Sequence, residues 1–170
     1  MKSTPRRHTF VFIGFTEEEL GVVGSNYYAS QLNEADLQRI AGMINIDSVG
    51  AGPTEVENSI ADKNLLARLQ TVTATMHLPL AFVNVSELGF SDYAPFRSRH
   101  VPTVSFHSIT QENLHLLHSP DDNRKALKTD HYYDTYQIVA VYLSYLDIML
   151  DTASRPATDS RPAKHGARTH

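Results

Sequence analysis

An acidic triplet near the N-terminus, Glu17, Glu18 and Glu19, is the first group of side chains that could do chemistry. No lysine or arginine lies between residues 16 and 25 to neutralise it. Two carboxylates held about 4 Å apart repel each other by roughly 4 kcal/mol at an effective dielectric near 20. A crevice that gathers such acids therefore favours a divalent cation. The alternative interpretation is a solvated first turn whose charges stabilise the N-terminus of the following helix.

Two later segments offer further metal ligands. Asp47 directly follows the apolar run at residues 40–46, where it could be a ligand at the end of a strand or a turn residue before Gly50. A long polar stretch later in the chain contains His115 and His118. Because the chain has no cysteine, any metal must be held by histidine, aspartate or glutamate, which favours zinc, manganese or another divalent ion.

Alternating strand and helix patterns predict how these side chains are positioned. Short apolar runs predict buried strands at residues 9–15, 40–46, 80–85 and 101–106. Helices are predicted at residues 21–32, at 62–76 with Asp62 as N-cap, at 91–97 capped by Ser91, and at 129–150 with an apolar stripe formed by Tyr132, Tyr136, Val139, Leu143, Leu146 and Leu150. This order predicts an α/β three-layer sandwich with a mainly parallel mixed sheet. The acidic triplet, Asp47 and the loop after Phe106 should then meet at the carboxyl ends of the strands.

Length and composition limit the function classes. The 170 residues fit one domain, which we place at residues 1–150, followed by a disordered tail at 151–170 that has no apolar periodicity. The net charge is −4 and there is no basic stripe, so a nucleic-acid partner is not expected. The sequence contains no apolar run of about 18 residues, so no membrane span is expected. The apolar run at 10–15 is too short for a signal peptide, and localisation and oligomeric state stay open.

Four motifs, in the same order, resemble those of the co-catalytic zinc exopeptidases, the family of leucyl aminopeptidases, aminopeptidase Y, glutamate carboxypeptidase II and the transferrin receptor. They are Glu-Glu-x-Gly-x-x-Gly-Ser at residues 18–25, Asn-Ile-Asp at 45–47, Ser-Asp at 91–92, and His-Ser-Pro-Asp-Asp at 118–122. The similarity covers residues 8–150, and it implies the same three-layer α/β fold. It also implies a zinc metallopeptidase, with an aminopeptidase favoured over a carboxypeptidase by the commonest activity in the family.

The resemblance also implies a role for each matching residue. Glu18 would be the general base, and Glu19 and His118 would share one metal ion. Asp47 would hold the second of two zinc ions. Ser91, Asp92 and Asp122 would support these ligands without being required to touch the metal. In this family, a metal-activated water attacks the peptide bond of a peptide substrate while the glutamate carries its proton.

The sequence departs from the family pattern in one respect. The family also uses a histidine and a metal-bridging aspartate that lie upstream of the Glu-Glu motif, and the residues before the first predicted strand match neither. The resemblance therefore implies an N-terminally truncated catalytic domain with three of the five family ligands. Since catalytic zinc normally keeps three protein ligands, we expect weak metal binding and little or no activity from the isolated chain.

Other functions remain open from the sequence. The chain could be a non-catalytic peptidase-like domain that binds a protein partner, as the transferrin receptor is within the family. It could be an unrelated α/β domain whose motif matches arise by chance. A glutaminyl cyclase is less favoured. The resemblance to that relative implies a substrate pocket that uses tryptophan, and the chain has no tryptophan.

Overall fold

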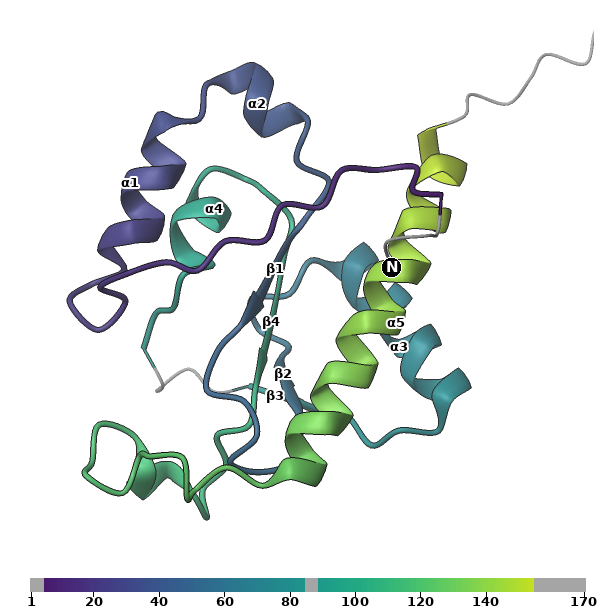
Figure 1. Ribbon diagram of the computed structural model, residues 1–170. Helices are drawn as coiled ribbons and strands as arrows, with labels where there is room; N and C mark the ends of the chain where they lie inside the picture. The colour runs from purple at the N-terminus through teal and green to yellow at the C-terminus, as the bar shows by residue number, and fades with distance from the viewer. Residues whose placement is uncertain (1–4, 85–88, 155–170) are drawn as a thin grey trace, which may run out of the picture.

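A four-stranded mixed sheet forms the centre of the computed structural model, which describes residues 5–84 and 89–154 (Figure 1). The strands are β1 (Met43–Ile46), β2 (Glu55–Glu57), β3 (Ala81–Val83) and β4 (Thr103–His107), in the order β1-β4-β2-β3. β1 pairs with β4 in parallel, β2 pairs with β3 in parallel, and β2 runs antiparallel to β4. The predicted α/β fold with a mainly parallel mixed sheet is confirmed.

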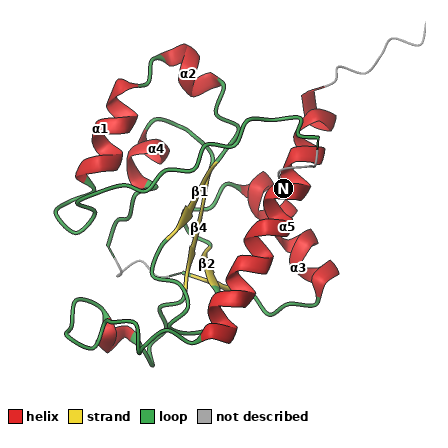
Figure 2. Ribbon diagram, in the orientation of Figure 1, coloured by secondary structure: helices red, strands yellow, loops and turns green. Residues whose placement is uncertain are grey.

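Helices cover both faces of this sheet. They are α1 (Val23–Gln31), α2 (Glu34–Gln38), α3 (Lys63–Met76), α4 (Ala94–Ser98) and α5 (Thr129–Ser154), with a short 3-10 helix η1 (Leu114–Leu116) in the loop after β4. α3 and α5 lie on one face, while α1, α2 and α4 lie on the other (Figure 2). Among the described helices, none is both long and apolar enough to cross a membrane.

The larger hydrophobic core lies between the sheet and the pair α3 and α5. It is built from the buried side chains Val56, Leu65, Leu69, Val72, Val104, Phe106, Ile138, Tyr142 and Leu146. Asp62 caps α3 as predicted, because its side chain accepts hydrogen bonds from the backbone N–H groups of Asn64 and Leu65. Tyr142 spans the two helices, since its hydroxyl donates to the Leu65 carbonyl at 2.9 Å. A smaller cluster around Leu37, Phe96 and Val101 fills the opposite face.

The strand predicted at residues 9–15 is wrong in the described structure. This segment is extended but belongs to no strand, and Val11 and Phe12 are 68% and 75% exposed. Phe15 is half-buried, and its ring packs against Tyr28 and Phe96. The segment passes over the end of the sheet near β1 rather than alongside it (Figure 1). A continuous apolar run predicts that its side chains are buried, but it does not supply a partner strand. No described strand forms ladder hydrogen bonds with residues 9–15.

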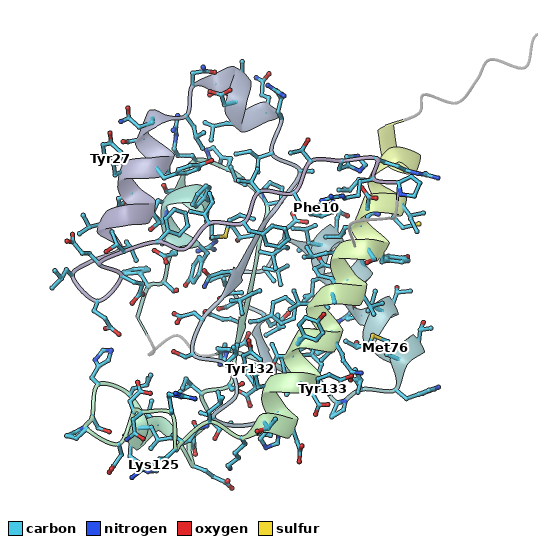
Figure 3. All side chains as sticks on the ribbon, in the orientation of Figure 1. Phe10, Tyr27, Met76, Lys125, Tyr132 and Tyr133 are labelled. Carbon is cyan, nitrogen blue, oxygen red and sulfur yellow. The ribbon has the colours of Figure 1, made fainter. Side chains whose placement is uncertain are left out.

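The core-facing side of α5 also differs from the prediction. Tyr132 and Tyr136 of the predicted stripe are exposed, and the first lies outside the core at the start of the helix (Figure 3). Leu146 of the predicted stripe is buried as expected, and Val139 and Leu150 pack against the core, but Thr135, Ile138 and Tyr142 are buried in addition. Asp147 on the same helix is 7% exposed, and its carboxylate accepts hydrogen bonds from the backbone N–H groups of Arg7 and His8.

Two further differences from the predicted elements concern β2 and the end of α5. The three-residue strand β2 was missed, because Glu55-Val56-Glu57 offers one apolar residue between two acids and so shows no apolar run. α5 continues to Ser154, past the predicted end at residue 150. The remainder of the predicted tail, residues 155–170, lies outside the described residues.

Candidate metal centre

The carboxyl ends of β1 and β4 lie at the same edge of the sheet because the two strands are parallel. Asp47 follows β1 directly, and its backbone N–H donates to the Phe106 carbonyl at 3.1 Å, which continues the ladder by one residue. The loop after β4 carries His118. Glu18 and Glu19 lie in the tight turn before α1, where the Val22 N–H donates to the Glu18 carbonyl at 2.8 Å.

Glu19 and His118 are in direct contact. Nε2 of the His118 imidazole lies 2.8 Å from Oε2 of the Glu19 carboxylate. The side chains of His118 and Glu19 are 71% and 68% exposed. This contact joins the turn before α1 to the loop after η1. Imidazole nitrogen and carboxylate oxygen are both ordinary zinc ligands, so the pair combines the two donor types that such an ion uses in a protein without cysteine.

Glu18 lies in the negative field of this crevice. Partial burial raises the pKa of the Glu18 carboxyl above its usual range, and the charges of Asp47, Glu19 and Asp92 raise it further. The His118 charge opposes the shift without cancelling it. Three acids therefore act on Glu18 at once, and the structure brings all of them, together with His118, within electrostatic reach of it.

A short chain of hydrogen bonds holds the Asp47 carboxylate. The Ser91 hydroxyl donates to Oδ2 of Asp47 at 2.8 Å, and Nδ2 of Asn45 donates to the Ser91 oxygen at 3.0 Å. Ser91 was predicted to cap the helix at 91–97, and this is wrong: the N-cap of α4 is Tyr93, and the Ser91 side chain is committed to Asp47.

The remaining two supporting residues have different surroundings. Oδ1 of Asp92 is buried and has no hydrogen-bond partner among the described residues. Buried polar atoms are nearly always paired, so this oxygen is an exception. It is an acceptor without a described donor, on a carboxylate whose charge acts on Glu18. Asp122 is exposed on the turn after His118, where its backbone N–H donates to the Ser119 carbonyl at 3.0 Å. Its charge is not among those that shift the pKa of Glu18.

Backbone strain accompanies the candidate residues. Glu17, Ser48 and His118 have φ angles of 56°, 49° and 57°, a left-handed conformation that residues other than glycine rarely adopt. Glu17 precedes Glu18, Ser48 follows Asp47, and His118 is itself a candidate ligand. Each such residue costs on the order of 1 kcal/mol, and such costs gather at functional sites.

The described residues fit a zinc ion in kind but not in number. They supply imidazole and carboxylate donors among several neighbouring acids, with a buried oxygen on Asp92 that has no partner among the described residues. In the described ranges, however, no group of three histidine, aspartate or glutamate side chains is arranged to hold one ion. Catalytic zinc normally has three protein ligands, so the Glu19–His118 pair is two-thirds of such a set.

His107 was missed by the sequence analysis. It ends β4 opposite Glu55 and is 8% exposed. Burial lowers the pKa of its imidazole, although the charge of Asp47 acts in the opposite direction. The Ile109 N–H donates to Nδ1 of His107 at 3.2 Å. The residue shares a sheet face with Ser105, because side chains alternate along a strand. That alternation, applied to the strand predicted at 101–106 and extended by one residue, is the signal that could have found it.

Comparisons with known proteins identify the family of this chain. The model of the family described as "Peptidase family M28" matches residues 1–143. Aminopeptidase YwaD of Bacillus subtilis strain 168 is 27% identical over 130 residues, which cover 72% of this chain and 29% of that protein. The interpretation of the motifs as chance matches is therefore wrong.

Solved structures share the fold. A zinc aminopeptidase from Bacillus subtilis superposes with a TM-score of 0.67 at 22% identity, over 76% of this chain and 33% of its own. An Acidobacteriales bacterium glutaminyl cyclase superposes with a TM-score of 0.62 at 17% identity, over 74% of this chain and 46% of its own. The chain spans about a third of the length of the aminopeptidases it matches. Since the family model covers most of the sequence, from residue 1 to residue 143, the chain belongs to peptidase family M28.

Proposed function

We propose that this chain carries part of the active site of a zinc-dependent aminopeptidase, which hydrolyses N-terminal peptide bonds. The observation that carries the proposal is the 2.8 Å contact between Nε2 of His118 and Oε2 of Glu19, next to a glutamate whose pKa is raised by burial and by neighbouring acids. Family membership supports a metallopeptidase, and the printed names of its relatives, a zinc aminopeptidase among them, support the choice of zinc and of aminopeptidase activity.

Each residue has a stated role in this proposal. Glu19 and His118 would hold one zinc ion, and Asp47 would hold a second. When bound, zinc supplies Lewis-acid activation of water and of the peptide carbonyl. The Glu18 carboxylate accepts the proton of the attacking water and passes it to the leaving amine. Its raised pKa suits this task, because a general base works best when its pKa approaches the operating pH.

The isolated chain should have weak activity. Only Glu19 and His118 lie in contact, and Asp47 is bound instead to Ser91. A zinc ion with two protein ligands is held less firmly than one with three. The 170-residue chain should therefore release little product from a chromogenic N-terminal amide, and rapid zinc-dependent release would contradict this part of the proposal.

Zinc affinity tests the site without relying on turnover. Titration of zinc into the chain, in competition with a chromogenic chelator, gives one dissociation constant for each variant. We expect His118→Ala and Glu19→Gln to weaken binding by about tenfold or more, since each removes one of two adjacent ligands. Glu18→Gln should keep the wild-type affinity. The matched control is His115→Ala, an exposed histidine of η1 in the same loop.

The outcomes of this titration separate two functions. If His115→Ala weakens binding as much as His118→Ala, the assigned ligand is wrong. If wild-type chain binds no zinc at millimolar concentration, the metallopeptidase role fails for this chain, and the non-catalytic peptidase-like domain that binds a protein partner takes its place.

A further inference from the structure

A chain of hydrogen bonds runs beneath Asp47, from the centre of the sheet to the crevice. Nδ2 of Asn45 donates to the hydroxyl oxygens of Ser105 and Ser91, both at 3.0 Å. The Ser91 hydroxyl donates to Oδ2 of Asp47 at 2.8 Å. Asn45 and Ser105 lie opposite each other in the β1–β4 ladder and are each 5% exposed, so the bond between them is shielded from water.

The direction of every bond in this chain is fixed from the Asp47 end. An ionised carboxylate can only accept, so the single hydroxyl proton of Ser91 must point at Asp47. The Ser91 oxygen then has only lone pairs left for its other partner. Asn45 must therefore present its amide nitrogen, and its second N–H is satisfied by Ser105. Because Nδ2 of Asn45 can only donate, it cannot accept the Ser91 proton, and Asp47 is the acceptor left for that proton.

Asp47 needs such a restraint in the absence of a cation. Its charge acts on Glu18, within a crevice that also contains the acids Glu19 and Asp92. Like charges at short range repel, and a half-buried carboxylate at the end of a strand can turn away about its Cα–Cβ bond. The hydrogen bond from Ser91 is the contact that opposes this rotation from below, and Ser48 adds a longer one at 3.3 Å to Oδ1.

We propose that Asn45 is a positioning residue that holds the Asp47 carboxylate in its crevice-facing rotamer by orienting the Ser91 hydroxyl. Asn45 touches neither a substrate nor a metal ion and acts only through Ser91. The consequence for zinc binding rests on the proposed function, whereas the effect on the Asp47 rotamer does not.

Side-chain scalar couplings of Asp47, measured by NMR on the metal-free chain, test the first step. Wild type should show one χ1 rotamer, and Asn45→Ala should show averaging over at least two. The matched control is Ser105→Ala, which removes a hydrogen bond from the same Nδ2 at the same burial but leaves the Ser91 branch intact. It should keep one rotamer. A merely structural role of the buried amide predicts the same couplings in both variants, and that result would overturn the proposal.

A smaller change keeps the test decisive if Asn45→Ala does not fold. Asn45→Ser retains a polar group but is too short to reach Ser91, so it should also release the Asp47 rotamer. Ser91→Ala should reproduce the averaging, and Ser91→Thr, which keeps a hydroxyl, should restore one rotamer. An unchanged Asp47 rotamer in folded Asn45→Ser would refute the positioning role.

Cobalt binding, followed by the visible absorption of the ion, tests the second step. We expect Asn45→Ser to weaken cobalt affinity by about tenfold and Ser105→Ala to leave it unchanged, as is typical of residues that orient a ligand. A released rotamer with unchanged cobalt affinity would overturn the role of Asn45 in metal binding. If wild type binds no cobalt while the rotamer result holds, the positioning of Asp47 stands and the proposed function fails.

Discussion

Nε2 of His118 lies 2.8 Å from Oε2 of Glu19, and this contact joins the turn before α1 to the loop after η1. Both side chains are about two-thirds exposed, so solvent screens the interaction. The conformational entropy lost when the two side chains are ordered also opposes it. A contact of this kind adds little to stability. Its position beside the acids that act on Glu18 is consistent with selection for a ligand pair rather than for a structural ion pair.

The first prediction separates these two roles of the Glu19–His118 pair. His118→Ala should change the free energy of unfolding by less than about 1 kcal/mol in the absence of zinc, because the pair is exposed. Added zinc should raise the melting temperature of wild type and leave that of the variant unchanged, since a ligand that binds only the folded state stabilises it. Thermal unfolding with and without zinc gives both quantities. A large loss of stability without zinc would show that the pair is structural.

Glu18 gives a pH-dependent prediction for stability. Burial, followed by the charges of neighbouring acids, raises its pKa in the folded state above the unfolded value of 4.5. The folded protein therefore binds the proton more tightly, and stability is lost as the pH rises from the unfolded pKa through the folded one. Glu18→Gln should then be more stable than wild type at pH 7, by less than about 1 kcal/mol because solvent screens the site.

Urea unfolding at several pH values checks this effect of Glu18→Gln. The stabilisation should disappear below the unfolded pKa, where the wild-type carboxyl is protonated in both states. Glu112→Gln, a change at an exposed carboxylate in the loop after β4, is the matched control and should leave the free energy of unfolding at pH 7 close to that of wild type. A variant less stable than wild type at pH 7 would contradict the crowding of acids around Glu18.

The same substitution predicts a catalytic effect in any form of the protein that shows peptidase activity. Glu18→Gln should keep zinc affinity and lower kcat by at least about 100-fold, since positioned proton transfer typically contributes that much. Glu17→Gln, a change at the neighbouring acid outside the motif, should keep most of the activity. Initial rates on a chromogenic amide measure both variants. Retained turnover in Glu18→Gln would place the base elsewhere.

Some elements of this structure could be predicted from sequence because local signals determine them. Asp62 caps α3 through its own side chain, and Asp47 follows the strand predicted from the apolar run at residues 40–46, which forms as β1. The segment at residues 9–15 has the same apolar signal but no described strand beside it. Strand pairing depends on a neighbouring segment, which the apolar run itself does not reveal. The burial of Asp147 was equally hidden, because its partners are backbone groups far away in the sequence.

The candidate site shows the same division. Glu18, Glu19, Asp47 and His118 could be proposed from the resemblance of their motifs, and the structure brings them within electrostatic reach of one another. The roles of Asn45 and Ser105 could not, since they depend on the register that places the two residues opposite each other in β1 and β4. Ser91 was recognised as a supporting residue but was given the wrong partner as a helix cap, because a serine before a short helix is the common signal for an N-cap.

The last prediction concerns Asp147, which fastens the N-terminal segment to α5. Desolvation by itself would raise the pKa of this carboxyl, but hydrogen bonds from the backbone N–H groups of His8 and Arg7, and from the His8 side chain, lower it below its usual value of 3.8. A depressed pKa contributes stability above the unfolded pKa, and this contribution is lost as the pH falls through the folded one.

Asp147→Asn should therefore lower the melting temperature at pH 7, and the difference from wild type should shrink in acid. The substitution should also release residues 7–15, because this segment has no strand pairing to hold it in place. Thermolysin, which cuts before large apolar residues, should then cleave between residues 9 and 13 faster in the variant. Asp134→Asn, a change on the same helix nearer its N-terminus, should leave the cleavage rate unchanged. Equal cleavage in wild type and Asp147→Asn would show that the hydrogen bonds of Asp147 do not hold the segment, and that the packing of Phe15 against Tyr28 and Phe96 is sufficient.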